Sequence, residues 1–165
     1  MNREEKIKEL WRQASDCYQK ARQEFEKGEY EKAAELAWGA VNAASGALCL
    51  RFLGRETPGI ALDFVREALV RAGLSELDVV NMLLAYRGAR EMQGAVLYGG
   101  RYDPEFHDPI ILREIPEYLC KIGRVLGMEV SGLKVGMSER GECGVAQATP
   151  ITLKGEISDE RAKGP

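Results

Sequence analysis

The sequence is almost without histidine, since His107 is the only one among its 165 residues. Its cysteines are far apart and form no Cys-x-x-Cys pair; they are Cys17, Cys49, Cys120 and Cys143. Zinc sites are typically built from closely spaced Cys and His ligands. Disulfide frameworks are read from sets of Cys in short secreted chains. The sequence therefore predicts no metal centre, and we interpret the first three cysteines as reduced thiols in helical core positions.

Motifs for common catalytic reactions are also missing. The sequence has no H-E-x-x-H and no Glu-x-x-His pair of the kind that holds two metal ions in a helical bundle. The glycine-rich stretch GLKVGMSERGECG lacks the Lys-Ser/Thr ending of a phosphate-binding loop. A Ser-His-Asp set would have to be built around His107, with no supporting spacing. No cofactor is therefore expected.

Long apolar runs are scarce, and no window approaches the roughly 18 uninterrupted apolar residues of a membrane span. The first residues, MNREEKIKEL, lack the apolar core of a signal peptide, so we expect a cytoplasmic protein without a membrane partner. The formal charge of −3 argues against an overall attraction to nucleic acid but leaves room for a local basic patch. With 45% hydrophobic and 30% charged residues, the chain has the composition of one globular domain.

What the sequence does contain is helical periodicity. Over residues 4–27, apolar side chains recur at steps of three and four, and Gly28 ends the segment. Further helices are expected over about 31–52, 60–72 and 75–98, with a last helix over 108–127. The sequence therefore predicts an all-α fold, an up-and-down bundle of about five helices over residues 1–127.

Two of these helices have specific start signals. Ser75 followed by Asp78 has the spacing of a capping box. Asp108 as the cap and Pro109 in the first turn are expected to open the last helix, in which Pro116 is expected to cause a kink. Residues 128–165 are rich in Gly and polar residues, and we interpret them as an irregular tail that offers at most short strands.

The second helix is unusual because it is lined by small residues. In AAELAWGAVNAASGALC, residues 33–49, 10 of 17 positions are Ala, Gly or Ser. Small side chains let neighbouring helices approach closely, so this helix is expected to be central. Gly39 and Gly46 support this view, because each costs about 1 kcal/mol in a helix interior and so suggests a contact, within one chain or between two copies.

This layout resembles the HEPN superfamily, and within it the small archaeal proteins of PaREP type. The likeness rests on AAELAWGAVNAASGAL, the Gly-Pro break after it, the stretch LAYRGAREMQGAVLYGGRYDPE and the final IPEYLCKIGRVL. The resemblance implies a helical bundle, often a homodimer. It also implies a defence or toxin–antitoxin setting, with RNA or a nucleotide as ligand or a nucleotidyltransferase as partner protein.

Active HEPN ribonucleases carry an Arg followed four to six residues later by His. The Arg stabilises the phosphate, and the His exchanges protons. Arg87 and Arg90 lie in the corresponding stretch, but Gln93 or Gly94 stands where the His is expected. Gln can form a hydrogen bond but cannot shuttle a proton. His107 follows Arg101 at the permitted spacing, so these two form the candidate catalytic pair, within an expected turn.

A binding site is the other interpretation of this region. Arg87 and Arg90 are three residues apart and share a helix face, with Gln93 and Tyr98 following, and such a cluster is suited to a phosphate or an acidic partner. The first hypothesis is therefore a non-catalytic, dimeric binding bundle, and a metal-independent ribonuclease is the alternative. A third, a tetratricopeptide-like adaptor, rests on ARQEFEKGEYEKAAELAWGAV, although no second copy of this stretch follows.

Overall fold

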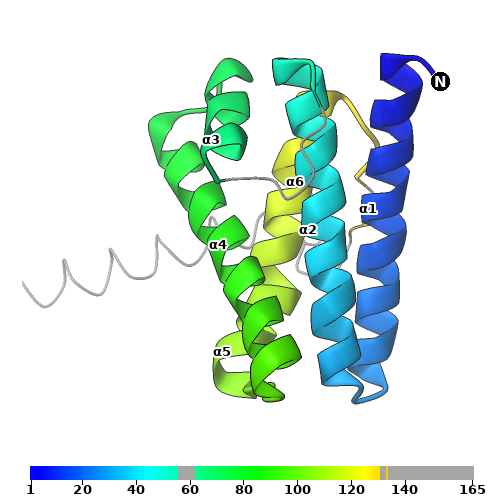
Figure 1. Ribbon diagram of the computed structural model, residues 1–165, viewed down its shortest axis with the longest axis vertical. Coiled ribbons are helices and arrows are strands. Elements are labelled where there is room, and N and C mark those ends of the chain that lie inside the picture. The colour runs from blue at the N-terminus through cyan, green and yellow to red at the C-terminus, as the bar shows by residue number, and fades with distance from the viewer. Residues whose placement is uncertain (56–61, 131–132, 134–165) are drawn as a thin grey trace, which may run out of the picture.

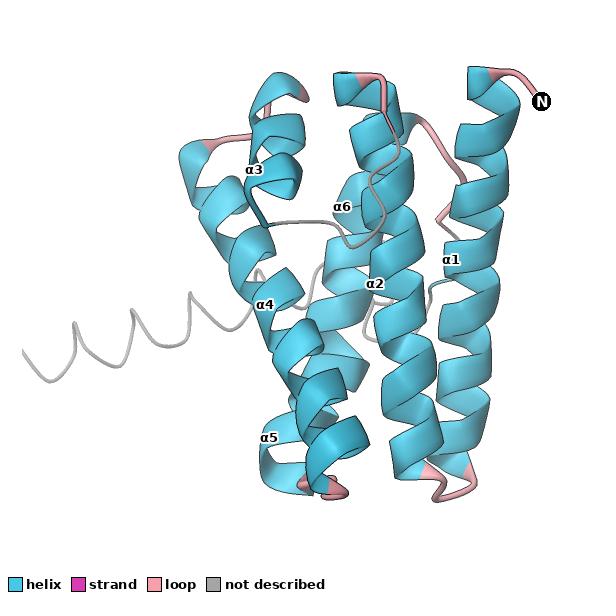
Figure 2. Ribbon diagram, viewed as in Figure 1, coloured by secondary structure: helices cyan, strands magenta, loops and turns pink. Residues whose placement is uncertain are grey.

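The computed structural model describes residues 1–55, 62–130 and 133. In these ranges the chain is an all-α bundle whose long helices run alternately up and down (Figure 1). Loops are confined to the helix ends (Figure 2). The predicted fold class is confirmed. The helices are α1 (Arg3–Glu26), α2 (Tyr30–Leu53), α3 (Leu62–Arg71), α4 (Glu76–Gly99), α5 (Pro104–Pro109), the π-helical segment η1 (Ile110–Glu114) and α6 (Ile115–Leu126).

Helix α2 lies at the centre of the bundle and packs against α1, α3, α4 and α6. Both of its glycines face α1: a Cβ atom at Gly39 would lie 3.8 Å from Cys17 Sγ, and one at Gly46 would lie 3.7 Å from Leu10 Cδ1. The prediction of a central helix is thus confirmed, and its glycines pack within the chain. A solenoid differs from this arrangement, because each of its repeats contacts only its neighbours.

The apolar composition of α2 follows from this central position. By length and composition, it is the one helix of the described ranges that is apolar enough to cross a membrane. Most of that segment is buried inside the bundle, as expected for the core helix of a globular protein. The cysteines agree with this core: Cys49 and Cys120 are buried thiols, and Cys17 is a half-buried one.

The capping box predicted at the start of α4 is only half formed. Ser75 Oγ accepts a hydrogen bond from the Asp78 N–H at 3.1 Å. The Asp78 carboxylate instead accepts from Lys121 Nζ at 3.2 Å, which links the start of α4 to α6. A complete box caps α1, where Asn2 and Glu5 accept from each other's backbone N–H.

The last helix begins five residues earlier than predicted, and this is a correction. Asp103 caps it and Pro104 occupies its first turn, so residues 104–109 are helical rather than part of a turn. Pro109, expected in the first turn, lies inside the helix. The two Asp-Pro pairs carry the same start signal, and the helix uses the earlier one.

The irregularity expected near Pro116 takes the form of a π-helical turn. The Ile115 N–H donates to the Ile110 carbonyl, five residues back. The next carbonyl, that of Ile111, would need a donor at position 116, where proline has no N–H. Tyr18 of α1 supplies it: its hydroxyl donates to Ile111 O at 2.8 Å in a buried position. A long-range side-chain bond thus replaces the missing backbone bond.

The chain after α6 packs back on the bundle. Trp11 Nε1 donates to the Glu129 carbonyl at 3.2 Å, and Val130 lies against Gly123 of α6. Leu133 is buried as well. The rest of the predicted tail, including its possible strands, lies outside the described residues.

A buried chain of hydroxyl groups joins α2 to α6. Ser45 Oγ lies 2.7 Å from both the Val41 carbonyl and the Tyr118 hydroxyl. Because the carbonyl can only accept, Ser45 donates to it, and Tyr118 therefore donates to Ser45. Burial raises the pKa of Tyr118, so its hydroxyl keeps its proton.

Because of this direction of donation, removing the Ser45 hydroxyl is expected to cost more unfolding free energy than removing the Tyr118 hydroxyl. Ser45→Ala leaves the Tyr118 hydroxyl buried without a partner, with an expected loss of about 1–3 kcal/mol in unfolding free energy. Tyr118→Phe leaves Ser45 still bonded to Val41 and is expected to cost about 1 kcal/mol or less. Urea unfolding followed by circular dichroism measures both losses, and equal losses would contradict the assigned direction.

Candidate functional site on helix α4

The structure places the candidate catalytic pair at one end of the bundle. His107 lies in α5, and its Nδ1 accepts a hydrogen bond from the Asp103 N–H at 2.9 Å. Its ring packs on Tyr102, with the ring centroids 5.1 Å apart. Arg101 is exposed in the loop before α5, and no hydrogen bond of the described residues joins it to His107. His107 thus helps to cap a short helix.

An aromatic cluster surrounds this cap. Tyr102 stacks on Tyr30, from the start of α2, with centroids 5.2 Å apart and an interplanar angle of 13°. Its hydroxyl donates a short hydrogen bond to the Asp108 carboxylate. Burial, and then this bond, raise the pKa of Tyr102. Together these contacts close the end of the bundle by joining the α1–α2 turn to α5.

Arg87 and Arg90 lie on the predicted common face of α4. With Leu62, Tyr86 and Glu91 they line a surface hollow of about 360 Å³. Arg87 Nε donates to Glu91 Oε1 at 3.0 Å, and both side chains are about two-thirds exposed. Burial raises the pKa of Tyr86, and the positive charge of Arg90 partly opposes this shift. This hollow offers guanidinium groups to a ligand, while the Tyr86 ring beneath them is only 1% exposed.

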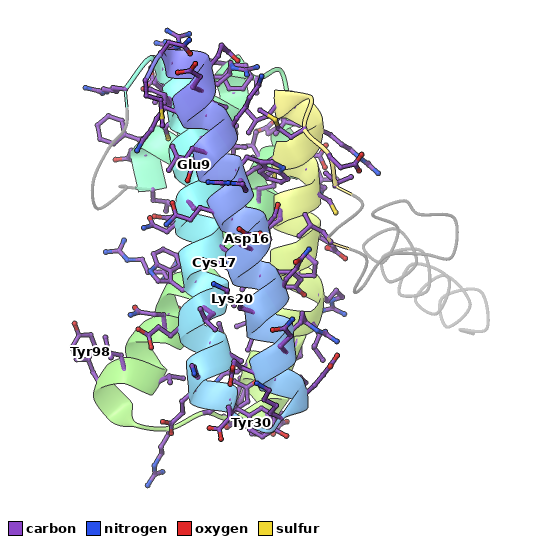
Figure 3. The ribbon with its side chains drawn as sticks, turned by 90° about the vertical axis from the view of Figure 1, so that its right-hand side faces the viewer. Glu9, Asp16, Cys17, Lys20, Tyr30 and Tyr98 are labelled. Carbon is purple, nitrogen blue, oxygen red and sulfur yellow. The ribbon has the colours of Figure 1, made fainter. Side chains whose placement is uncertain are left out.

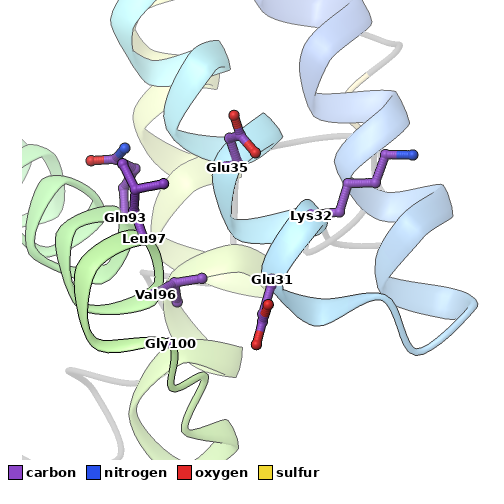
Figure 4. A pocket seen from close by; sticks show the side chains of 7 residues that line it. All are labelled: Glu31, Lys32, Glu35, Gln93, Val96, Leu97 and Gly100. Carbon is purple, nitrogen blue, oxygen red and sulfur yellow. The ribbon is translucent and has the colours of Figure 1, made fainter.

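Gln93 and Tyr98 are not part of this hollow. Gln93 lines a second one, of about 420 Å³, between the start of α2 and the end of α4 (Figure 4). Two carboxylates, of Glu31 and Glu35, line it with one cation, Lys32, so its net charge is negative and does not favour an anion. Tyr98 is 87% exposed and points away from the bundle (Figure 3). The predicted four-residue cluster is therefore divided among three places.

The outer side of α4 carries a surface that we did not predict. It exposes large apolar side chains that recur at steps of three and four, and Val70 of α3 is exposed beside them. We call this the outer face of α4, made of Leu77, Val80, Leu84, Arg87, Glu91 and Tyr98. A third hollow, of about 400 Å³, lies between α3 and α4 and is lined by Val70, Leu74, Val80 and their neighbours.

The sequence held a signal for this surface. In ELDVVNMLLAY, one apolar series consists of Val79, Met82 and Tyr86, which are buried. A second series, Leu77, Val80 and Leu84, repeats on the opposite side of the helix. A helix with apolar residues on two opposite sides is expected to be covered on both sides, and the described chain covers only one of them.

Comparison of the chain with protein-family models, with curated proteins and with solved structures finds no match. Within the described ranges, no group of three or more His, Cys, Asp or Glu side chains is arranged to hold a metal ion. The site therefore has to be interpreted from its own geometry.

Proposed function

We propose that this chain is a non-catalytic, HEPN-like helical bundle that dimerises and acts by binding a protein partner. The observation that carries the proposal is the outer face of α4, where Leu77, Leu84 and Tyr98 are 70%, 59% and 87% exposed. Several large exposed apolar side chains on one face of a helix are typical of interaction surfaces. The PaREP-type resemblance adds a cytoplasmic setting of the defence or toxin–antitoxin kind, with a nucleotidyltransferase as the partner protein.

Binding of a nucleotide or RNA is the second candidate. It is favoured by one observation, the hollow that Arg87 and Arg90 line together. Guanidinium groups bind phosphate through paired hydrogen bonds. Glu91 lines the same hollow and holds Arg87, which leaves less positive charge for an anion. The balance of these charges favours a protein partner.

The contacts of His107 support binding over catalysis. An imidazole nitrogen that accepts a backbone N–H is not available to take up a proton from a substrate. Nδ1 is used in this way, and the ring is held against Tyr102. In the proposed function, His107 therefore stabilises the start of α5.

An RNA cleavage assay tests this proposal. Incubation of the full chain with labelled single-stranded RNA in the presence of a chelator is expected to leave the RNA intact. His107→Ala is expected to lower the unfolding midpoint in urea without creating or removing cleavage, since the substitution removes a bond that caps α5. Cleavage that is lost in both His107→Ala and Arg101→Ala would replace the proposal with the ribonuclease hypothesis.

A further inference from the structure

We infer that two copies of this chain associate through the outer faces of α4, packed antiparallel about a two-fold axis at the level of Ala89. This inference rests on the dimer in the proposed function and specifies its interface. Helix α4 lies at one edge of the bundle (Figure 1), and its described neighbours are α2, α3, η1 and α6. The side chains of its outer face are exposed beside these contacts. The outer face is thus left without a partner in the described chain.

The order of residues along the outer face is self-complementary. In a two-fold symmetric antiparallel pair centred on Ala89, Arg87 of one copy lies opposite Glu91 of the other, and the reverse holds as well. Val80 lies opposite Tyr98, and Leu84 lies opposite Gly94, a large residue against a small one. Apolar contacts therefore flank a central pair of opposite charges at both ends.

The charges favour this register over the others. A parallel pair would place Arg87 against Arg87 and Glu91 against Glu91, which is unfavourable for like charges. An antiparallel pair centred on Met82 would join Val80 to Leu84 but would place Arg87 opposite Leu77 and leave Tyr98 uncovered. Of these three arrangements, the one centred on Ala89 gives each Arg87 two carboxylates, its own Glu91 at 3.0 Å and that of the second copy.

The hollow that Arg90 lines adjoins the interface in this arrangement, because Arg87 and Glu91 line the hollow and also meet the second copy. Arg90 lies one helical step from Arg87, to the side of the line of residues that meet at the axis. Each copy would therefore present its hollow beside the interface. A partner that binds there would contact both chains, which connects the dimer to the proposed binding role.

Charge-swap variants test the pairing. Arg87→Glu and Glu91→Arg each place like charges at both positions, within one chain and across the interface. Each variant alone is expected to have a mass near that of one 18.3 kDa chain by light scattering, whereas the unchanged protein has twice that mass. An equimolar mixture of the two variants is expected to form a heterodimer, because every Glu then meets an Arg. All four positions are exposed, so circular dichroism should show unchanged helicity.

Cysteine cross-linking tests the register. A mixture of Val80→Cys and Tyr98→Cys chains, treated with a mild oxidant, is expected to give a disulfide-linked heterodimer. A mixture of Val80→Cys and Leu84→Cys chains is the matched control and is expected to give none. The unchanged protein controls for the native cysteines. Cross-linking in the control pair alone would indicate the shifted register and overturn the inference.

The outcomes separate this inference from the proposed function. A dimer by mass that neither cross-links through Val80 and Tyr98 nor responds to the charge swaps would overturn the α4 interface and leave a dimeric binding protein. A mass of one chain at all concentrations tested would overturn both the interface and the proposed dimer. Heterodimer formation together with the Val80–Tyr98 cross-link would support both.

Discussion

Gly123→Ala is expected to lower the free energy of unfolding by about 1–3 kcal/mol, the cost of overpacking a filled core. A Cβ atom at this position would overlap Val130 Cγ1 and lie 2.8 and 2.9 Å from two ring carbons of Trp11. Val130 belongs to the segment after α6, which packs against the core. The indole of Trp11 is 6% exposed and is held by its bond to Glu129, so it cannot withdraw.

Gly39→Ala and Gly46→Ala are the matched controls. Both positions lie inside α2, but a Cβ atom there would meet α1 at 3.8 and 3.7 Å, an ordinary contact distance. Alanine favours a helix over glycine by about 1 kcal/mol, so these variants are expected to be as stable as the unchanged protein or more stable. Urea unfolding followed by circular dichroism measures all three. A Gly123→Ala variant that matches its controls would show that α6 has room at this contact.

The second large effect is expected for Tyr18→Phe. This change removes the hydroxyl that donates to the Ile111 carbonyl at 2.8 Å and leaves that carbonyl buried. The residue five positions after Ile111 is Pro116, which has no N–H and cannot donate in its place. A buried, unsatisfied polar group costs about 1–3 kcal/mol, and we expect a loss of that size in chemical unfolding.

A second substitution tests the cause of this loss. Pro116→Ala supplies an N–H where the helix lacks one, so in the Tyr18→Phe background it is expected to recover part of the lost stability. In the unchanged protein, the Ile111 carbonyl already has its donor, so Pro116→Ala is expected to bring no such gain. The difference between the effects of Pro116→Ala on unfolding free energy in the two backgrounds is the coupling free energy. Tyr98→Phe, at an exposed side chain, is the control and is expected to have no effect. Additive effects of Tyr18→Phe and Pro116→Ala would show that the hydroxyl does not replace the backbone donor.

These two expectations show where sequence patterns predict the fold and where they do not. The helices α1, α2 and α4 follow from apolar spacing and glycine ends, because those signals are local. The start of the last helix does not, since two Asp-Pro pairs lie five residues apart and only packing decides between them. The glycine with the tightest contact is Gly123, whose neighbour Trp11 lies at the other end of the chain. No local pattern indicates such a contact.

The candidate site shows a similar division. The shared face of Arg87 and Arg90 was predictable because it depends only on the helical repeat. The separation of Gln93 and Tyr98 from them was not, because it depends on how α2 and α4 approach each other. The outer face of α4 was visible as a second apolar series, but its exposure depends on which helices cover α4. Which helices cover α4 is a property of the tertiary structure and has no local sequence pattern.

The two edges of the bundle differ in a way that limits assembly. Helix α1, the opposite edge, turns an almost entirely polar surface outward, including Asp16 and Lys20 (Figure 3). The segment after α6 also packs against α1, through Trp11 and Glu129. Self-association through α4 alone is isologous and consumes that surface in both subunits. In the proposed dimer, growth would therefore stop at a closed pair, because the polar surface of α1 does not match the outer face of α4.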